Sequence, residues 1–222
     1  MRLISRGAFV ALAVVLLAGV VGSASASAAE CPGTGSGVAL CSGGHVQEGT
    51  FAFTGKQNRS YTLEPEGLGK WTCESGGGSK GQFVATKGKV EITGLVIRTA
   101  DCHLAGTTCT VKPVIFDGGN PTGSGPGLGG VLPNAGAVTL SSPAKGEPFT
   151  ELITTNCVQA GTLKIKGKQV CSLPSSTVEA STHQLTCDAS GSKLATGSRS
   201  VFVTLGETIE LSPGKVFSLQ QS

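Results

Sequence analysis

The fold class is decided by the stretch Val201-Phe202-Val203-Thr204-Leu205-Gly206-Glu207-Thr208-Ile209-Glu210-Leu211. Val201, Val203 and Leu205 alternate with their neighbours, and Ile209 and Leu211 resume the same phase after Gly206-Glu207. Because successive side chains of a β-strand point to opposite faces of its sheet, this period of two indicates a half-buried strand. The run Thr162-Leu163-Lys164-Ile165-Lys166 has the same period, with Leu163 and Ile165 on one face.

The run Lys89 to Ile97 predicts a strand with a bulge. Val90 and Ile92 place even positions inside, whereas Leu95 and Ile97 place odd positions inside, so the phase changes across Thr93-Gly94. One extra residue in a strand produces such a change, and we expect a β-bulge at Gly94.

The rest of the body alternates short apolar or β-branched runs with Gly, Pro, Asn and Ser, and no window keeps a helical period over three turns. We expect an all-β fold: a single domain over residues 50–222, a β-sandwich or barrel of about a dozen short strands held together by disulfides. Further strands are predicted near residues 50–54, 60–63, 70–74, 81–86, 108–116, 136–140, 148–155 and 182–187.

Residues 1–29 have the three parts of a signal peptide. Arg2 and Arg6 precede an uncharged apolar run from Gly7 to Val21, and small residues around Ala28 and Ala29 offer A-x-A cleavage sites. No later stretch approaches the roughly 20 apolar residues that a membrane-spanning helix needs. We therefore predict a secreted, extracellular protein without an integral membrane span, which begins with a glycine-rich segment at residues 30–49.

The charge balance favours no nucleic-acid partner. The chain has 17 basic and 14 acidic residues, a formal charge of +3, and cleavage removes two arginines, which leaves +1. Nucleic-acid binding depends on a concentrated basic surface. Such a surface is not indicated here.

All eight cysteines follow the predicted cleavage site, and an even number in an exported chain indicates disulfides. Eight cysteines allow 105 connectivities, so spacing only narrows the choice. The short loops between Cys31 and Cys41 and between Cys102 and Cys109, and the turn between Cys171 and Cys187, favour local pairs; Cys73 and Cys157 are left for a long-range pair. Because no C-x-x-C motif or spaced His pair occurs, no zinc site is expected.

One glycine-rich motif and one acidic motif can be considered as cofactor or metal sites, and neither predicts one. Gly125 to Gly130 matches G-x-G-x-x-G, but Pro133 excludes the helix that a dinucleotide site requires, so a surface loop is expected. Asp117 near Asn120 has too few acidic neighbours for a calcium loop. We expect no cofactor and no metal.

Catalytic constellations are weak. The three histidines are His45, His103 and His183, and no G-x-S-x-G elbow is present. A triad of Asp101, His103 and a distant serine stays an alternative, because triads assemble from any chain order. Carboxylate pairs for sugar hydrolysis are also open; the candidates are Glu64 with Glu66, Glu207 with Glu210, and Glu147 with Glu151.

Two surface features have both a structural and a functional interpretation. Lys164, Lys166 and Lys168 project from one strand face; such lysines guard an exposed strand against pairing, or they form a ligand surface for an anionic polymer. Trp71 beside Lys70 either packs in the core near Cys73 or stacks on a sugar.

Several segments resemble uncharacterised secreted proteins of actinobacteria. They are Thr62-Leu63-Glu64 through Trp71-Thr72-Cys73, Gly94 to Cys102, Gly106 to Thr110, Phe149 to Cys157, Leu163 to Lys168 and Val201 to Leu211. The resemblance implies export and an all-β fold, and it implies no activity. It also implies that Cys31, Cys41, Cys171 and Cys187, which are additions to the usual four cysteines, pair with one another.

The leading hypothesis is a non-enzymatic β module, secreted or associated with the cell envelope, that binds a surface glycan or a protein. It rests on the many strands and on the weakness of every catalytic constellation. The alternative is a secreted hydrolase that acts on wall or environmental polymers through a carboxylate pair or a histidine.

Overall fold

The structure is a computed structural model that describes residues 30–31, 37–74, 76–111, 114–119, 125–133, 136–157, 161–212 and 214–221. The predicted signal peptide, residues 1–29, lies outside the described residues. The fold is all-β, as predicted. Its strands are β1 (Val38–Ser42), β2 (His45–Gln47), β3 (Gly49–Pro65), β4 (Trp71–Cys73), β5 (Gly78–Thr86), β6 (Lys89–Arg98), β7 (Cys102–Leu104), β8 (Thr110–Val111), β9 (Ile115–Phe116), β10 (Leu128–Leu132), β11 (Gly136–Ser141), β12 (Thr150–Thr155), β13 (Gly161–Leu173), β14 (His183–Thr196), β15 (Arg199–Leu211) and β16 (Ser218–Gln221).

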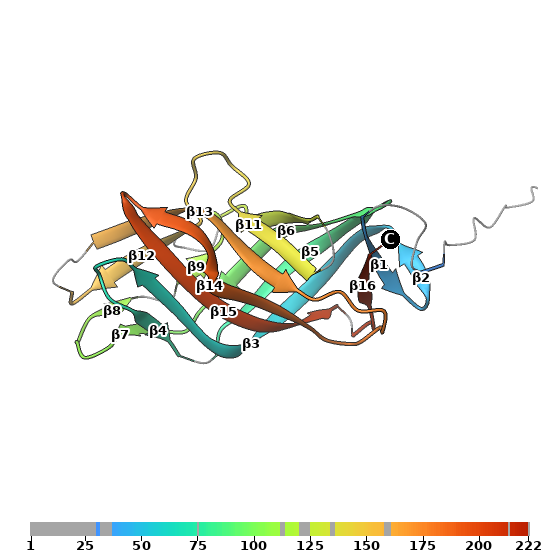
Figure 1. Ribbon diagram of the computed structural model, residues 1–222. Helices are drawn as coiled ribbons and strands as arrows, with labels where there is room; N and C mark the ends of the chain where they lie inside the picture. The colour runs from blue at the N-terminus through green and yellow to red at the C-terminus, as the bar shows by residue number, and fades with distance from the viewer. Residues whose placement is uncertain are drawn as a thin grey trace, which may run out of the picture.

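Hydrogen bonding closes the large sheet into two barrel-like rings that share the four long strands β3, β13, β14 and β15. Strands β4, β7, β8 and β12 complete the first ring, which we call the mouth ring, through the β12–β13 pair. Strands β5, β6, β10 and β11 complete the second, the distal ring, through the β10–β6 pair. Figure 1 shows the two sets of short strands toward opposite ends of the long ones. The molecule is therefore one elongated barrel with two sections.

A small three-stranded sheet lies at the end of the distal ring. β1 pairs with β2 and with the C-terminal strand β16, and it contacts β5 and β6. Val38 and Leu40 of β1 belong to the main hydrophobic core. The predicted glycine-rich segment 30–49 thus contains two strands and part of the core in its described residues.

Side chains fill the barrel interior. Phe53 and Phe83 pack with their ring centroids 4.7 Å apart in the distal ring, and Phe116 and Phe149 meet edge to face at 5.8 Å. All four are buried. Such pairs add about 0.5–1.5 kcal/mol to the burial of the rings themselves, so these four phenylalanines stabilise the interior.

The predicted phases agree with the structure. Ile165 is buried and Leu163 half-buried, whereas Lys164 and Lys166 are exposed. At Gly94 the register changes: Gln82 pairs with Thr93 but Lys80 pairs with Val96, so two residues of β6 oppose one of β5. Gly94 has φ +60°. The predicted bulge is confirmed, with glycine in the left-handed conformation that bulges of this kind use.

The strands are longer than the short strands that the sequence predicts. Residues 50–54 and 60–63 belong to the single strand β3, because the polar run between them stays in the ladder: Lys56 pairs with Gly78, and Gln57 with Glu207. β14 likewise continues beyond the predicted end at Cys187, to Thr196. Polar residues on the outer face and glycines interrupt the apolar alternation, so the sequence pattern does not show that each strand continues.

Two of the four predicted disulfide pairs are wrong. Cys31–Cys41 and Cys171–Cys187 are present as predicted. Instead of Cys102–Cys109 and Cys73–Cys157, the structure has Cys73–Cys102 and Cys109–Cys157. In the β7–β8 hairpin, Cys102 stands opposite Val111 on one side and Cys73 of β4 on the other. Strand register, and not loop length, therefore selects the partner of Cys102.

Candidate functional site

A cavity of about 320 Å³ opens at the end of the mouth ring, and we call it the cup. It lies between the β3–β4 turn, the β7–β8 hairpin, the end of β12 and the start of β13. Its lining residues are Gly67, Leu68, Trp71, Leu104, Thr107, Thr108, Cys109, Thr154, Asn156, Cys157 and Leu163. Barrel mouths are frequent ligand sites, and ligand pockets range over about 300–1,000 Å³; the cup is at the small end of this range.

Local backbone conformation brings the walls of the cup together. Gly69 has φ +86°, and a Cβ atom at this position would lie 2.7 Å from Cδ1 of Leu104. Glycine is thus required where the β3–β4 turn packs on β7. Asn156 also has a positive φ, 56°, which asparagine tolerates better than most residues. This turn directs the end of β12 toward Cys109, with which Cys157 forms its disulfide.

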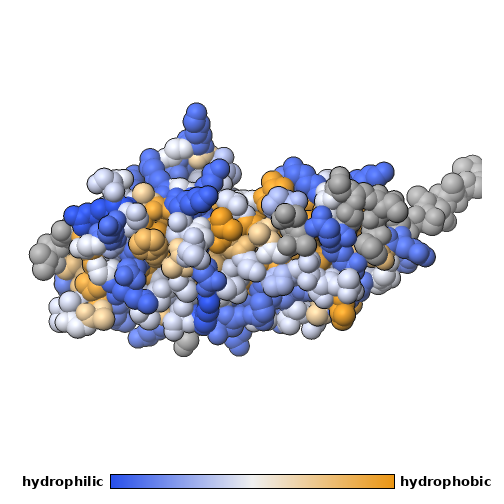
Figure 2. Space-filling view, viewed as in Figure 1, coloured by the Kyte–Doolittle hydropathy of each residue, from blue (hydrophilic) through white to orange (hydrophobic). Residues whose placement is uncertain are grey.

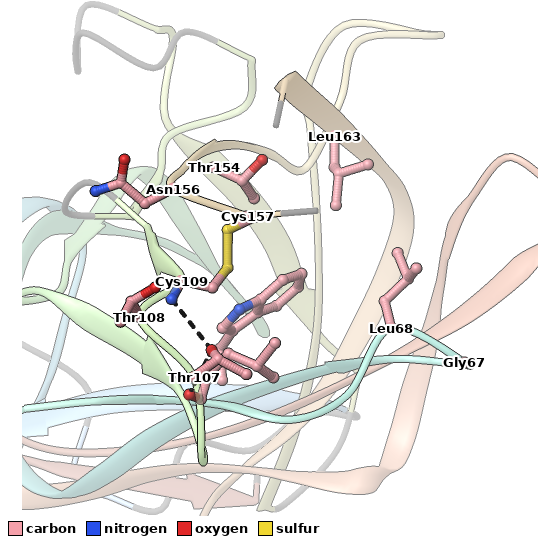
Figure 3. A pocket seen from close by; sticks show the side chains of 11 residues that line it. Gly67, Leu68, Thr107, Thr108, Cys109, Thr154, Asn156, Cys157 and Leu163 are labelled. Carbon is pink, nitrogen blue, oxygen red and sulfur yellow. Dashed lines mark hydrogen bonds between the residues drawn. A yellow bond between two sulfur atoms is a disulfide. The ribbon is translucent and has the colours of Figure 1, made fainter. Parts of the chain in front are cut away.

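Apolar groups make up most of the inner wall. Figure 3 shows Leu68 and Leu163 on one side of the cavity and the Cys109–Cys157 disulfide on the other. Trp71 lines the cup with 3% of its surface exposed, and its Nε1 has no hydrogen-bond partner within the described chain. A buried donor without a partner costs about 1–3 kcal/mol, so the indole is retained here against an energetic cost. Trp71 therefore packs in the core, which was one of its two interpretations, and it also lines a cavity; its stacking on a sugar stays a prediction.

Two of the hydroxyl groups in the wall, those of the exposed Thr107 and the buried Thr154, are already bonded. Thr107 Oγ1 donates to the carbonyl of Leu104 at 3.0 Å and accepts from the N–H of Cys109 at 3.1 Å, the bond drawn in Figure 3. Thr154 Oγ1 donates to the carbonyl of Gly161 at 3.1 Å and accepts from its N–H at 3.0 Å. Thr108 and Asn156 supply exposed polar groups at the edge. No lining residue is charged, so the cup suits an uncharged, mainly apolar group.

A cluster of polar side chains, separate from the cup, lies inside the barrel between the two sections. Glu207 of β15 is fully buried, and its carboxylate oxygens accept hydrogen bonds from Tyr61 of β3 and Ser79 of β5. Burial raises the pKa of Glu207, and the hydrogen bonds from Ser79 and Tyr61 oppose this effect. Burial and the nearby charge of Glu207 raise the pKa of Tyr61 as well. The cluster keeps an acid in the interior by satisfying both of its oxygens.

Ser79 of this cluster also lines a shallow surface cavity of about 400 Å³. Gly55 and the run Gly76 to Gly78 form part of its wall, together with Arg98. The cavity lies where β3 leaves β5 and has not yet met β4, and the N–H of Gly77 is held there by Oε1 of Gln57 at 2.8 Å. Sequence reasoning missed this cluster. Its signal was the odd position of Glu207, because the other odd positions from Val201 to Leu211 are apolar.

The predicted lysine surface lies on the outer face of β13, next to the cup. Lys164, Lys166 and Lys168 are all exposed. Lys164 Nζ lies 3.1 Å from Oε1 of Glu151, and Lys168 pairs across the sheet with Lys193. Lys164 and Lys166 line a depression of about 530 Å³, which shares Leu163 with the cup.

Two of the histidines have other contacts, and the structure separates one of the carboxylate pairs. His103 Nε2 lies 3.4 Å from Oε1 of Glu74, and both side chains are exposed. His183 is buried against Phe217, with its Nε2 2.7 Å from the carbonyl oxygen of that residue. Glu207 is buried whereas Glu210 is exposed on the other face of β15, so this pair cannot act on one substrate.

The glycine-rich and acidic motifs have structural roles. The carboxylate of Asp117 accepts from the N–H groups of Gly119 at 3.2 Å and Gly125 at 2.9 Å, which ties the two described ends of its loop together. The motif at 125–130 leads into β10, not into a helix. Asn120 lies outside the described residues. Across the described ranges, no group of three or more His, Cys, Asp or Glu side chains is placed to hold a metal ion.

Comparisons with protein-family models, with curated proteins and with solved structures find no match to this chain. Among the described residues there is no helix of the length and apolarity needed to cross a membrane.

Proposed function

We propose that this protein is a secreted, non-enzymatic binding module, and that its ligand inserts an uncharged apolar group into the cup at the mouth ring. The observation that carries the proposal is the lining of the cup: three leucines, a tryptophan and a disulfide, with no charged residue. The four disulfides are consistent with an extracellular location.

The lining favours some partners over others. A surface glycan or a protein is the partner expected from the sequence. Sugar hydroxyls need many hydrogen-bond partners, whereas Thr107 and Thr154 are already bonded to the backbone. A partner that presents an apolar group therefore fits the cup better than a sugar residue does.

Trp71 makes the proposal testable without a label, because it is the one tryptophan of the chain and lines the cup. The oxidised protein is titrated with glycans, peptides and small apolar compounds while its fluorescence is followed. We expect a saturable change that is lost in Leu68→Glu, which places a carboxylate in the cup, and kept in the matched control Leu68→Met. Saturable binding that Leu68→Glu leaves intact for every ligand would overturn the proposal.

A secreted hydrolase is the second candidate, and one observation favours it: Ser79 donates to the buried carboxylate of Glu207 beside an open cavity. A carboxylate with a raised pKa is a better base for activating a serine. A fluorophosphonate probe distinguishes the two functions. Labelling of Ser79 that disappears in Ser79→Ala would establish the hydrolase, and absence of labelling with intact ligand binding supports the binding module.

A further inference from the structure

We propose that the ligand is a free anionic amphiphile, whose apolar part occupies the cup and whose negatively charged head group lies on the basic outer rim beside it. This inference rests on the proposed function and adds the chemical class of the ligand. The single observation behind it is that an uncharged cavity and a lysine-lined depression meet at one residue, Leu163.

The cup excludes a charged head group. Its inner wall offers the ring of Trp71, three leucines and a disulfide. Apart from the buried Nε1 of Trp71, the side-chain polar groups of the lining without a hydrogen bond to the described chain are those of Thr108 and Asn156 at its edge. Moving an ionised group into such surroundings without a partner costs several kcal/mol. Any charge on the ligand must therefore stay outside, at the rim.

The rim next to the cup is the start of β13. Residues Thr162 to Ile165 pair with β12 on one side, while the pairing with β14 begins at Lys166. The side chain of Leu163 is directed toward the cup, as Figure 3 shows, and those of Lys164 and Lys166 lie on the opposite face. A ligand that leaves the cup over this edge therefore meets Lys164 and Lys166, one and three residues beyond Leu163 on the strand.

The charges at this rim are mixed, with an accessible basic group on the outer side. Lys164 is paired with Glu151 but its side chain is 62% exposed. Lys166 forms no ion pair within the described residues. At the start of β15, Nη1 of Arg199 donates to the main-chain oxygen of Glu66 at 3.4 Å. Lys166 is therefore free to bind an anion, and Lys164 can share one.

The size of the cup and the surface around it favour a small free molecule over a protein surface. About 320 Å³ holds one short chain or ring system. On the face shown in Figure 2, hydrophilic side chains cover most of the surface and hydrophobic ones occur in small separate areas. A protein partner would need a broad interface, whereas an amphiphile needs the cup and the adjacent lysines alone.

Three probes with the same chain and different head groups test the inference: decanoate, decanol and decyltrimethylammonium, each below its micelle concentration. Binding is followed by Trp71 fluorescence and by calorimetry. Because exposed ion pairs contribute up to about 1 kcal/mol, we expect decanoate to bind about fivefold more tightly than decanol at low salt. The cation should bind most weakly, and added salt should remove the differences.

Variants locate the head group. The double variant Lys164→Gln, Lys166→Gln should bind decanoate no better than decanol, while the control Lys87→Gln, an exposed lysine in the β5–β6 turn near the other end, should keep the preference. Equal affinity for decanoate and decanol in the wild type would overturn the inference, and so would a preference that the double variant retains. Failure of all three probes would also overturn it. The proposed function fails separately, when no extracellular ligand shows binding that depends on Leu68.

Discussion

Glu207 is an acidic residue in the apolar interior of the barrel. It occupies an inward position of β15 between Leu205 and Ile209, both buried. An unpaired carboxylate there would be strongly destabilising, and the hydroxyls of Tyr61 and Ser79 offset part of that cost by bonding both oxygens. Tyr61 belongs to β3 and Ser79 to β5, so their hydrogen bonds to Glu207 join both strands to β15. An apolar side chain in place of Glu207 would not provide these bonds.

The raised pKa of Glu207 predicts a pH dependence of stability. Below the pKa of the unfolded state the carboxyl is protonated in both states. As the pH rises, the unfolded state releases this proton before the folded state does, so the free energy of unfolding falls until the raised folded-state pKa is passed. Glu207→Gln should reduce this fall. Urea denaturation between pH 4.5 and 8 measures it.

The matched control for that experiment is Glu210→Gln, an exposed acid on the other face of the same strand. It should keep the wild-type pH dependence. An identical pH profile for the wild type and Glu207→Gln would contradict the prediction, because other titrating groups are common to both proteins and cancel in the comparison.

At the scale of single elements, the bulge in β6 is set by one glycine. Gly94 has φ +60°, and no atom lies within 4 Å of the position a Cβ would take. The substitution Gly94→Ala therefore meets no steric clash and pays only for the left-handed backbone, about 1 kcal/mol. Gly94→Asn should recover part of this loss, since asparagine tolerates that conformation. Chemical denaturation of the three proteins checks the order; equal stability of the alanine and glycine proteins would contradict it.

The lengths of the loops that the disulfides close predict which of two disulfides contributes more to stability. In the chain-entropy model, closing the loop of Cys109–Cys157 contributes about 4 kcal/mol and that of Cys31–Cys41 about 3 kcal/mol. The sequence separations behind these values are 48 and 10 residues. The double variant Cys109→Ser, Cys157→Ser should therefore lower the melting temperature more than Cys31→Ser, Cys41→Ser. A larger loss in the second variant would show that the end sheet matters more than the mouth.

Prediction from sequence succeeded where one strand carries its own signal. The phases of β13 and β15 and the bulge at Gly94 depend on consecutive residues, and so does the local pair Cys171–Cys187, whose members oppose each other in a hairpin. The partner of Cys102 depends on which strand lies beside β7, which consecutive residues do not encode. The cup could not be predicted for the same reason, although the lysines beside it could, because it joins Leu68, Leu104 and Leu163 from separate elements.

At the scale of the whole molecule, the shared strands couple the two barrel sections. β3, β13, β14 and β15 cross both rings, so neither ring can lose its hydrogen bonds without disturbing strands of the other. Independent unfolding of one section would leave long strand edges unpaired, which is unfavourable. We therefore expect one cooperative unfolding transition.

Phe83→Leu tests this coupling. Phe83 is buried in the distal ring, whereas Trp71 reports on the mouth ring. The substitution should cost about 1–3 kcal/mol and lower the midpoint seen by Trp71 fluorescence as much as that seen by far-ultraviolet circular dichroism. A shift in the circular dichroism midpoint alone, with the fluorescence midpoint unchanged, would show that the sections unfold separately.

The pairing of β1 with β16 also fixes how the molecule can be attached to a support. Val38 lies opposite Gln221, so the two outermost strands of the described chain end side by side, away from β4, β7, β8 and β12 (Figure 1). A tether at the C-terminus would therefore hold the barrel upright with the cup facing outward. Biosensor chips, display on phage and fusion to a reporter enzyme would all leave the opening unobstructed, whereas coupling through surface lysines would modify the rim itself.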